Sequence, residues 1–86
     1  MYYIFIKPSA LKELARIPPP ARTRIEQAID GLGVEPRPIG CRKIRGSGTA
    51  YRLRVGDYRV IYEVHDKDLV VIVVRVGHRK DVYRNR

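Results

Sequence analysis

The sequence predicts an α+β fold in which a hairpin of two helices packs on one face of a small, twisted, mostly antiparallel four-stranded sheet. The expected order is strand–helix–helix–strand–strand–strand. Two observations predict it. Between residues 8 and 32 the apolar residues recur with helical spacing, interrupted by three consecutive prolines. From residue 50 to residue 77 the chain alternates apolar and polar residues or runs through valine and isoleucine, as strands do.

The N-terminal part supplies the first strand and both helices. Residues 2–7 are rich in aromatic and β-branched side chains, which favour a strand. Pro8 opens the first helix, because a proline in the first turn costs no hydrogen bond, and the prolines at 18–20 end it. The second helix is expected over residues 21–32. The apolar residues expected to face the sheet are Leu11, Leu14, Ile17, Ile25, Ala28, Ile29 and Leu32.

A β-hairpin over residues 50–64 is the most sharply defined element, because a two-residue Gly-Asp loop joins its strands. Such a loop fixes the register, so Arg54 should lie opposite Arg59. The flanking pairs are then Leu53 with Val60 and Val55 with Tyr58. Period-two alternation places Arg52 on the same face as these two arginines. Like charges directly opposite each other destabilise a sheet, so the pairing indicates that this face binds an anion.

Residues 33–48 are predicted to be a long connection, because they contain two prolines and four glycines. Long connections in small domains are usually functional. This one is expected to contribute to a binding surface through its basic residues Arg37, Arg42, Lys43 and Arg45. After the hairpin, the Val/Ile run from residue 69 to residue 77 predicts a central strand, with Arg75 near its end.

The charge of the chain is unevenly distributed. Its 86 residues, expected to form a single domain over 1–86, carry a net charge of +9 with a pI of about 10.2. Residues 1–41 hold six basic and four acidic residues, whereas residues 42–86 hold twelve and five. A basic half that also contains the hairpin arginines favours a nucleic-acid partner over a merely solvated surface.

The sequence disfavours a membrane or secreted location. The longest apolar run is too short to cross a bilayer, and the N-terminus lacks the features of a signal peptide. The single cysteine cannot form an internal disulfide. We therefore expect a cytoplasmic protein without a membrane partner.

Few kinds of chemistry are available to the side chains. Two histidines and one cysteine are too few for a metal site, and no glycine-rich loop precedes a helix, so neither metal nor cofactor is expected. Cys41 has no histidine nearby in sequence and is not expected to act as a nucleophile. The proton carriers that remain are Glu63, His65, His78 and Tyr83. RNA supplies its own nucleophile, the 2′-hydroxyl, so arginines that hold and neutralise a phosphate would suffice for its cleavage.

The chain resembles the RelE/ParE superfamily of bacterial and archaeal toxins over essentially its whole length. The motifs that carry the resemblance are KIRG at 43–46, YRLR at 51–54, GDYRVIY at 56–62, VGHR at 76–79 and VY at 82–83. The last two are similar to the RelE branch. RelE proteins are ribosome-dependent endoribonucleases that cut messenger RNA in the ribosomal A site, whereas ParE proteins poison DNA gyrase. The resemblance implies the RelE fold and a metal-independent endoribonuclease that inhibits translation.

Site residues follow from the same resemblance. It implies that Arg59 and Arg79 hold the phosphate attacked by the 2′-hydroxyl, and that Tyr83 orients the base or assists proton transfer. The other candidates are His78 as a proton carrier, Arg52 and Arg54 in the catalytic set, and an RNA-binding group of Arg42, Lys43, Arg45 and Arg75.

One departure from the family matters for the chemistry. Arg52 and Arg54 stand where well-known RelE toxins have lysines, and arginine does not give up its proton. They are therefore expected to clamp phosphate rather than act as bases. Either Tyr83 or His78 then moves the proton, or positioning and charge suffice, or the activity is weak.

The resemblance also implies partners: the ribosome and messenger RNA, a separately encoded acidic antitoxin that covers the arginines, and operator DNA bound through the antitoxin complex. The chain ends at Arg86, which is expected to leave little room for the longer C-terminal helix of some relatives. The alternatives are a ParE-like gyrase poison and a weakly active or inactive member that only binds antitoxin and operator DNA. The sequence does not indicate codon preference, antitoxin stoichiometry or oligomeric state.

Overall fold

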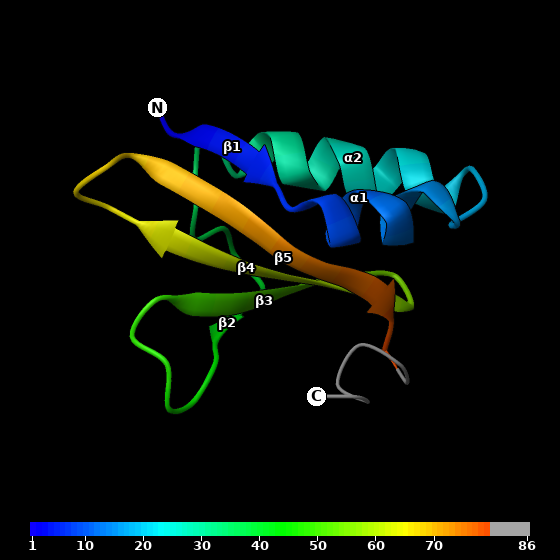
Figure 1. Cartoon of the computed structure of the whole chain (residues 1–86). Helices are drawn as coiled ribbons and strands as arrows, with labels where there is room; N and C mark the ends of the chain where they lie inside the picture. Colours follow the sequence, from blue (N-terminus) through cyan, green and yellow to red (C-terminus); the bar gives the residue numbers. More distant parts are fainter. Residues whose placement is uncertain (80–86) are drawn as a thin grey trace.

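In a computed structural model of the chain, which describes residues 1–79, two helices lie on one face of a five-stranded sheet (Figure 1). The order across the sheet is β1-β5-β4-β3-β2, with β1 parallel to β5 and the other neighbours antiparallel. The predicted α+β fold is confirmed. The elements are β1 Tyr3–Ile6, α1 Pro8–Ala15, α2 Ala21–Gly31, β2 Cys41–Lys43, β3 Ala50–Val55, β4 Tyr58–His65 and β5 Val70–His78.

The expected count of four strands is wrong, because β2 forms inside the predicted connection. Cys41–Lys43 pairs with the edge of β3, and the amide of Ile44 donates to the carbonyl of Ala50 at 2.9 Å. Gly40 and Gly46, on either side of β2, both have positive φ, which a glycine adopts without strain. Three residues without apolar alternation carry no strand signal of their own, so only the pairing with β3 makes this segment a strand.

The helices and the sheet enclose one hydrophobic core. α1 and α2 lie beside each other, and residues of both line a shallow groove between them. Glu13 attaches α1 to β5: its carboxylate accepts from the Val76 amide at 2.8 Å and from Arg75 Nε at 3.2 Å. The buried core residues are Ala10, Leu14, Ile17, Ile25, Ile29, Leu32, Leu53, Val60, Tyr62, Val64, Val71, Val73 and Val76. Of the predicted helix residues, Leu11 is instead exposed.

The predicted hairpin register is confirmed. Arg54 lies opposite Arg59, Leu53 opposite Val60, and Val55 opposite Tyr58. On the other side of β4, a register shift between Ile61 and Tyr62 interrupts the pairing with β5. The shift changes which residues of β5 face the core. Its position could not be predicted from a continuous Val/Ile run, because such a run has no alternation of apolar and polar residues.

Arg37 was predicted to contribute to the basic binding surface, but its side chain instead bonds the segment before β2 to other parts of the fold. Its Nη2 lies 2.7 Å from Asp66 Oδ2, and its Nε donates to the Tyr51 hydroxyl at 2.9 Å. The Tyr2 hydroxyl donates to the other oxygen of Asp66 at 2.6 Å. The buried Tyr62 hydroxyl donates to the Pro36 carbonyl at 2.8 Å. These contacts hold the chain that leads into β2.

No helix in the part of the chain that the structure describes is long and apolar enough to span a membrane.

Candidate anion-binding site

Three adjacent strands bring four arginines to the sheet face that the helices leave uncovered. β2 contributes Arg42, β3 contributes Arg52 and Arg54, and β4 contributes Arg59. The register places Arg42 directly opposite Arg52, and Arg54 directly opposite Arg59. We call these four residues the arginine row. Two like-charged cross-strand pairs disfavour the free fold, and a bound anion would remove that repulsion.

The arginine row lines a pocket of about 230 Å³, completed by Gly40. A neighbouring hollow of about 540 Å³ is lined by residues 41–45 together with Arg52. Because Arg42 and Arg52 line both, the basic surface is continuous from the β2–β3 loop to the middle of the sheet. Lys43 and Arg45, both exposed, line the second hollow. The structure therefore places these two predicted RNA-binding residues beside the row.

Arg59 has an unusual environment within the row. Its side chain is half-buried, and its Nη1 is buried without a hydrogen-bond partner among residues 1–79. A buried donor left unsatisfied costs about 1–3 kcal/mol, and most buried donors have a partner. The residue opposite Arg59 on β5 is Gly77, which contributes no side chain. A phosphate oxygen is the kind of acceptor that a guanidinium in this position would take.

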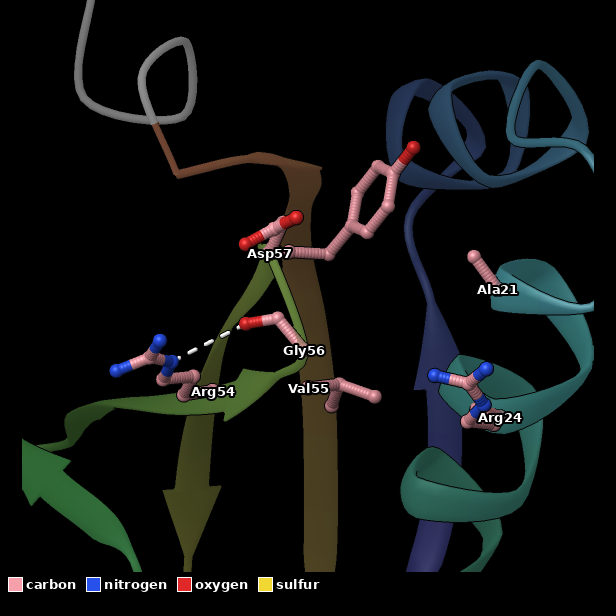
Figure 2. Close-up of a pocket in the computed structure, with 7 residues that line it drawn as sticks. Ala21, Arg24, Arg54, Val55, Gly56 and Asp57 are labelled. Atoms are coloured by element: carbon pink, nitrogen blue, oxygen red, sulfur yellow. Dashed lines mark hydrogen bonds between the residues drawn. The ribbon is translucent and has the colours of Figure 1, made fainter.

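Arg54 is held along the hairpin turn. Its Nε donates to the Gly56 carbonyl at 3.1 Å, as Figure 2 shows. This bond uses one donor of the guanidinium and fixes the direction of the side chain. Its two Nη groups lie on the far side from the carbonyl (Figure 2). Gly56 has a φ of +61°, which the tight turn requires.

Arg79 lies at the same end of the sheet as Arg54 and Arg59. Its backbone amide donates to the Asp57 carbonyl at 2.8 Å, which fixes it beside the hairpin turn, and its side chain is exposed. The structure thus brings a fifth predicted arginine near the row through the end of β5. Tyr83 lies outside the described residues.

His78 lies on the opposite face from Arg59. It pairs with Tyr58 in the register, and the two rings meet edge to face with centroids 5.7 Å apart. Tyr58 packs against the hydrophobic core. The structure therefore does not bring His78 together with the arginine row, because successive residues of a strand point to opposite faces.

Arg75 also lies apart from the row. Its Nε contacts Glu13 of α1 at 3.2 Å, and both side chains are about one-third exposed. This ion pair links β5 to the helix layer. The sequence offered no signal for it, because 62 residues separate the two partners.

The perturbed titrating groups lie away from the arginine row. Hydrogen bonds from Arg37 and then from Tyr2 hold the pKa of the Asp66 carboxyl below its usual value. The hydrogen bond to Asp66 raises the pKa of Tyr2, and burial raises the pKa of Tyr62. Glu63 and His65 form a partly buried pair, with His65 Nε2 3.0 Å from Glu63 Oε1. Among residues 1–79, glycine and arginine line the 230 Å³ pocket, and these residues can bind and neutralise an anion but do not readily exchange a proton.

No group of three or more histidine, cysteine or acidic side chains that could hold a metal ion is found in residues 1–79. The arrangement is suited to electrostatic stabilisation, in which fixed donors surround a charged centre.

Comparison with known proteins identifies the family. A family model described as the ParE toxin of a type II toxin–antitoxin system matches residues 4–83. The chain belongs to the RelE/ParE toxin superfamily. Its relatives place it in the RelE-type branch. It is 32% identical to the mRNA interferase toxin RelE of Escherichia coli over 81 residues, which cover 92% of this chain and 84% of that protein. It is 31% identical to the toxin RelG of Mycobacterium tuberculosis, covering 96% of this chain and 97% of that one.

Solved structures of RelE toxins have the same fold. The archaeal RelE–RelB complex from Pyrococcus horikoshii matches with a TM-score of 0.82 and 34% identity, covering 93% of this chain and 97% of that one. The isolated E. coli RelE toxin matches with a TM-score of 0.80 and 28% identity, covering 91% of this chain and 84% of that one. The resemblance to the RelE branch is confirmed.

Proposed function

We propose that this RelE-type chain is the toxin of a type II toxin–antitoxin system and a ribosome-dependent endoribonuclease that cuts messenger RNA in the ribosomal A site. The observation that carries the proposal is the arginine row, in which Arg59 presents a buried, unpaired donor. The similarity to an mRNA interferase toxin supports messenger RNA as the source of the anion. Translating ribosomes would place this activity in the cytoplasm.

The proposed reaction uses the nucleophile of the substrate. The 2′-oxygen attacks the adjacent phosphorus, its proton is released, and the bond from phosphorus to the 5′-oxygen breaks as that oxygen gains a proton. The products are a 2′,3′-cyclic phosphate and a 5′-hydroxyl. The pentacoordinate phosphorus carries more negative charge than the ground state, so fixed guanidinium donors stabilise it preferentially.

Each arginine has a distinct proposed part in this reaction. Arg59 binds the non-bridging oxygens of the scissile phosphate, because its donor is already buried and unpaired. Arg54 faces it across the hairpin and shares the charge. Arg79, beside the turn, closes the site from the end of β5. Arg42 and Arg52 bind the RNA strand further from the scissile phosphate, and Lys43 and Arg45 lie in the neighbouring hollow beside them.

Proton transfer is assigned to groups outside the arginine row. Arg52 and Arg54 are proposed to bind phosphate and not to act as bases, because a guanidinium has donors and no acceptor. His78 packs against Tyr58 on the other face, so Tyr83 keeps the proposed role from the family resemblance. Ribosomal groups and water are proposed as the other proton carriers. Positioning of the 2′-hydroxyl against the phosphate provides the rest of the rate enhancement.

The proposed partner is an acidic antitoxin, encoded separately, that covers the arginine row and so occupies the RNA site. Structures of RelE toxins with RelB antitoxins exist for relatives. Carboxylates matched to the row would relieve the repulsion between its arginines. The same complex would carry the toxin to operator DNA.

Induced expression in growing bacteria separates this proposal from its alternatives. We expect incorporation of labelled amino acids to stop before DNA synthesis does, and an Arg59→Met variant made at the same level to leave it unaffected. Filamentation with DNA damage would indicate a gyrase poison instead. Normal growth despite accumulation of the folded protein would indicate an inactive member.

A further inference from the structure

We infer a second RNA phosphate site at the open edge of β3, where Arg24 of helix α2 and Arg54 flank the β3–β4 turn. The inference deepens the proposed function and rests on it for the identity of the ligand, a phosphodiester of RNA. It makes Arg24 a substrate-positioning residue that neither the sequence pattern nor the family motifs indicated.

The site is a pocket of about 320 Å³ between the helix layer and the hairpin (Figure 2). β2 pairs with β3 only as far as Leu53, so no described strand covers the edge at Arg54 and Val55. Ala21 and Arg24 line the pocket from α2, and Gly56 lines it from the turn. Arg24 Nη1 lies 4.0 Å from the position that a Cβ on Gly56 would occupy, so α2 and the turn are in contact range.

The charges around this pocket favour an anion. Among residues 1–79, Arg24 has no ion-pair partner, and the first turn of α2 carries no acidic residue. Within the described part of the chain, Asp57 is the one carboxylate lining the pocket, and it forms no ion pair with either arginine. The residues that line the pocket include two arginines and one carboxylate, so its surroundings are net positive. Figure 2 shows the Arg54 guanidinium on the other side of the turn from Arg24, so Arg24 is the arginine that would contact a phosphodiester on the helix side.

Arg54 connects this pocket to the arginine row, because it lines both. One pocket is lined from α2 and the other from β2 and β4, and in Figure 2 Arg54 and Arg24 stand on opposite sides of the turn. An RNA strand whose scissile phosphate lies against Arg59 would therefore continue around the hairpin end, where the next part of its backbone meets Arg24. The basic surface thus extends from the sheet to the helix layer.

The test compares Arg24→Ala with Arg22→Ala, a control of equal charge on the same helix. Arg22 lines the groove between the two helices instead. Binding of a short unstructured oligoribonucleotide is measured by fluorescence anisotropy over a series of salt concentrations. The logarithm of the binding constant falls as the logarithm of the salt concentration rises. Each lost phosphate contact makes this slope less steep by about 0.7 for single strands. We expect that decrease for Arg24→Ala and no decrease for Arg22→Ala. Equal slopes for the two variants would overturn the inference.

Cleavage on programmed ribosomes identifies which RNA supplies the phosphate. Messages carrying a neutral methylphosphonate at single positions near the cut are compared between the wild type and Arg24→Ala. If a methylphosphonate at one position slows cleavage by the wild type but does not slow cleavage by Arg24→Ala any further, Arg24 contacts that phosphate of the message. A loss in the variant that is independent of every substitution, and absent in Arg22→Ala, assigns the phosphate to ribosomal RNA. No difference between Arg24→Ala and Arg22→Ala contradicts the site.

The outcomes distinguish the two proposals. A wild-type protein that cuts messages, together with an Arg24→Ala variant that binds and cuts like Arg22→Ala, refutes only this site. A wild-type protein that never cuts, while Arg24→Ala still reduces the salt slope, refutes the proposed reaction and keeps the RNA-binding site.

Discussion

Arg54 and Arg59 lie directly opposite each other across the β3–β4 hairpin, and the Nη1 of Arg59 is buried without a hydrogen-bond partner among residues 1–79. The free fold therefore contains two unfavourable features at one place. Both are relieved by the same ligand, an anion that accepts hydrogen bonds from the guanidinium groups. This coincidence links the stability of the hairpin to its proposed function.

Replacement of Arg59 by methionine should separate activity from stability. Arg59→Met removes the repulsion and the unsatisfied donor while keeping much of the side-chain volume. We expect the free energy of unfolding, from urea denaturation, to rise by about 0.2–1 kcal/mol. Cleavage should fall by about 10²–10³-fold. The control is Arg16→Met, an exposed arginine after α1. A marked loss of stability in Arg59→Met would show that Arg59 serves the fold instead.

Removal of the Arg79 side chain should abolish cleavage without harming the fold. Its backbone amide makes the contact with Asp57, and its side chain is exposed, so Arg79→Ala should change the free energy of unfolding by less than about 0.5 kcal/mol. We expect the rate of message cleavage to fall by about 10²-fold or more. An Arg79→Ala protein that cuts as fast as the wild type would refute its assignment to the site.

His78 should be dispensable for the reaction. Because it packs against Tyr58 on the face opposite the row, His78→Gln should lower stability by about 0.5–1.5 kcal/mol through loss of the aromatic contact. The single-turnover rate on ribosomes should stay at the wild-type value across neutral pH. A drop of about 10²–10⁴-fold, the usual contribution of a general acid or base, would restore His78 as the proton carrier.

The pairing of Asp66 with Arg37 should make stability depend on acid. The pKa of Asp66 is lowered in the fold from 3.8, so the folded state binds fewer protons than the unfolded chain. The contribution of Asp66 to the free energy of unfolding is therefore complete above its ordinary pKa and is lost as the pH falls through its lowered pKa in the fold. Urea denaturation at a series of acidic pH values should show a smaller acid loss for Asp66→Asn than for the wild type. Identical pH profiles for the two proteins would show that the pair does not stabilise the fold.

The hairpin could be predicted from sequence because its determinants are local. A two-residue loop sets the register, and the register alone puts Arg54 opposite Arg59. β2 could not be predicted, since three residues become a strand only by pairing with β3. The Arg42–Arg52 pair, half of the arginine row, was therefore not foreseen as a pair. The sequence indicated both Arg42 and Arg52 as candidate site residues but not that they face each other.

Contacts between distant segments account for the other differences. The Arg75–Glu13 and Arg37–Asp66 pairs join elements far apart in the chain, so both arginines were assigned to a binding surface. The face of His78 depends on the pairing of β5 beyond the register shift at Ile61 and Tyr62. Arg24 was missed because an isolated helical arginine carries no signal until the turn at Gly56 is placed beside it. The role of Tyr83 stays a prediction.

Mapping of 5′ ends on a defined message tests the central claim most directly. The message is incubated with programmed ribosomes and the purified protein, beside a lane without ribosomes and a lane with Arg59→Met. The account predicts new 5′-hydroxyl ends within the A-site codon, only when ribosomes and the wild-type protein are both present. An intact message in every lane, with the protein folded and bound to ribosomes, would contradict it.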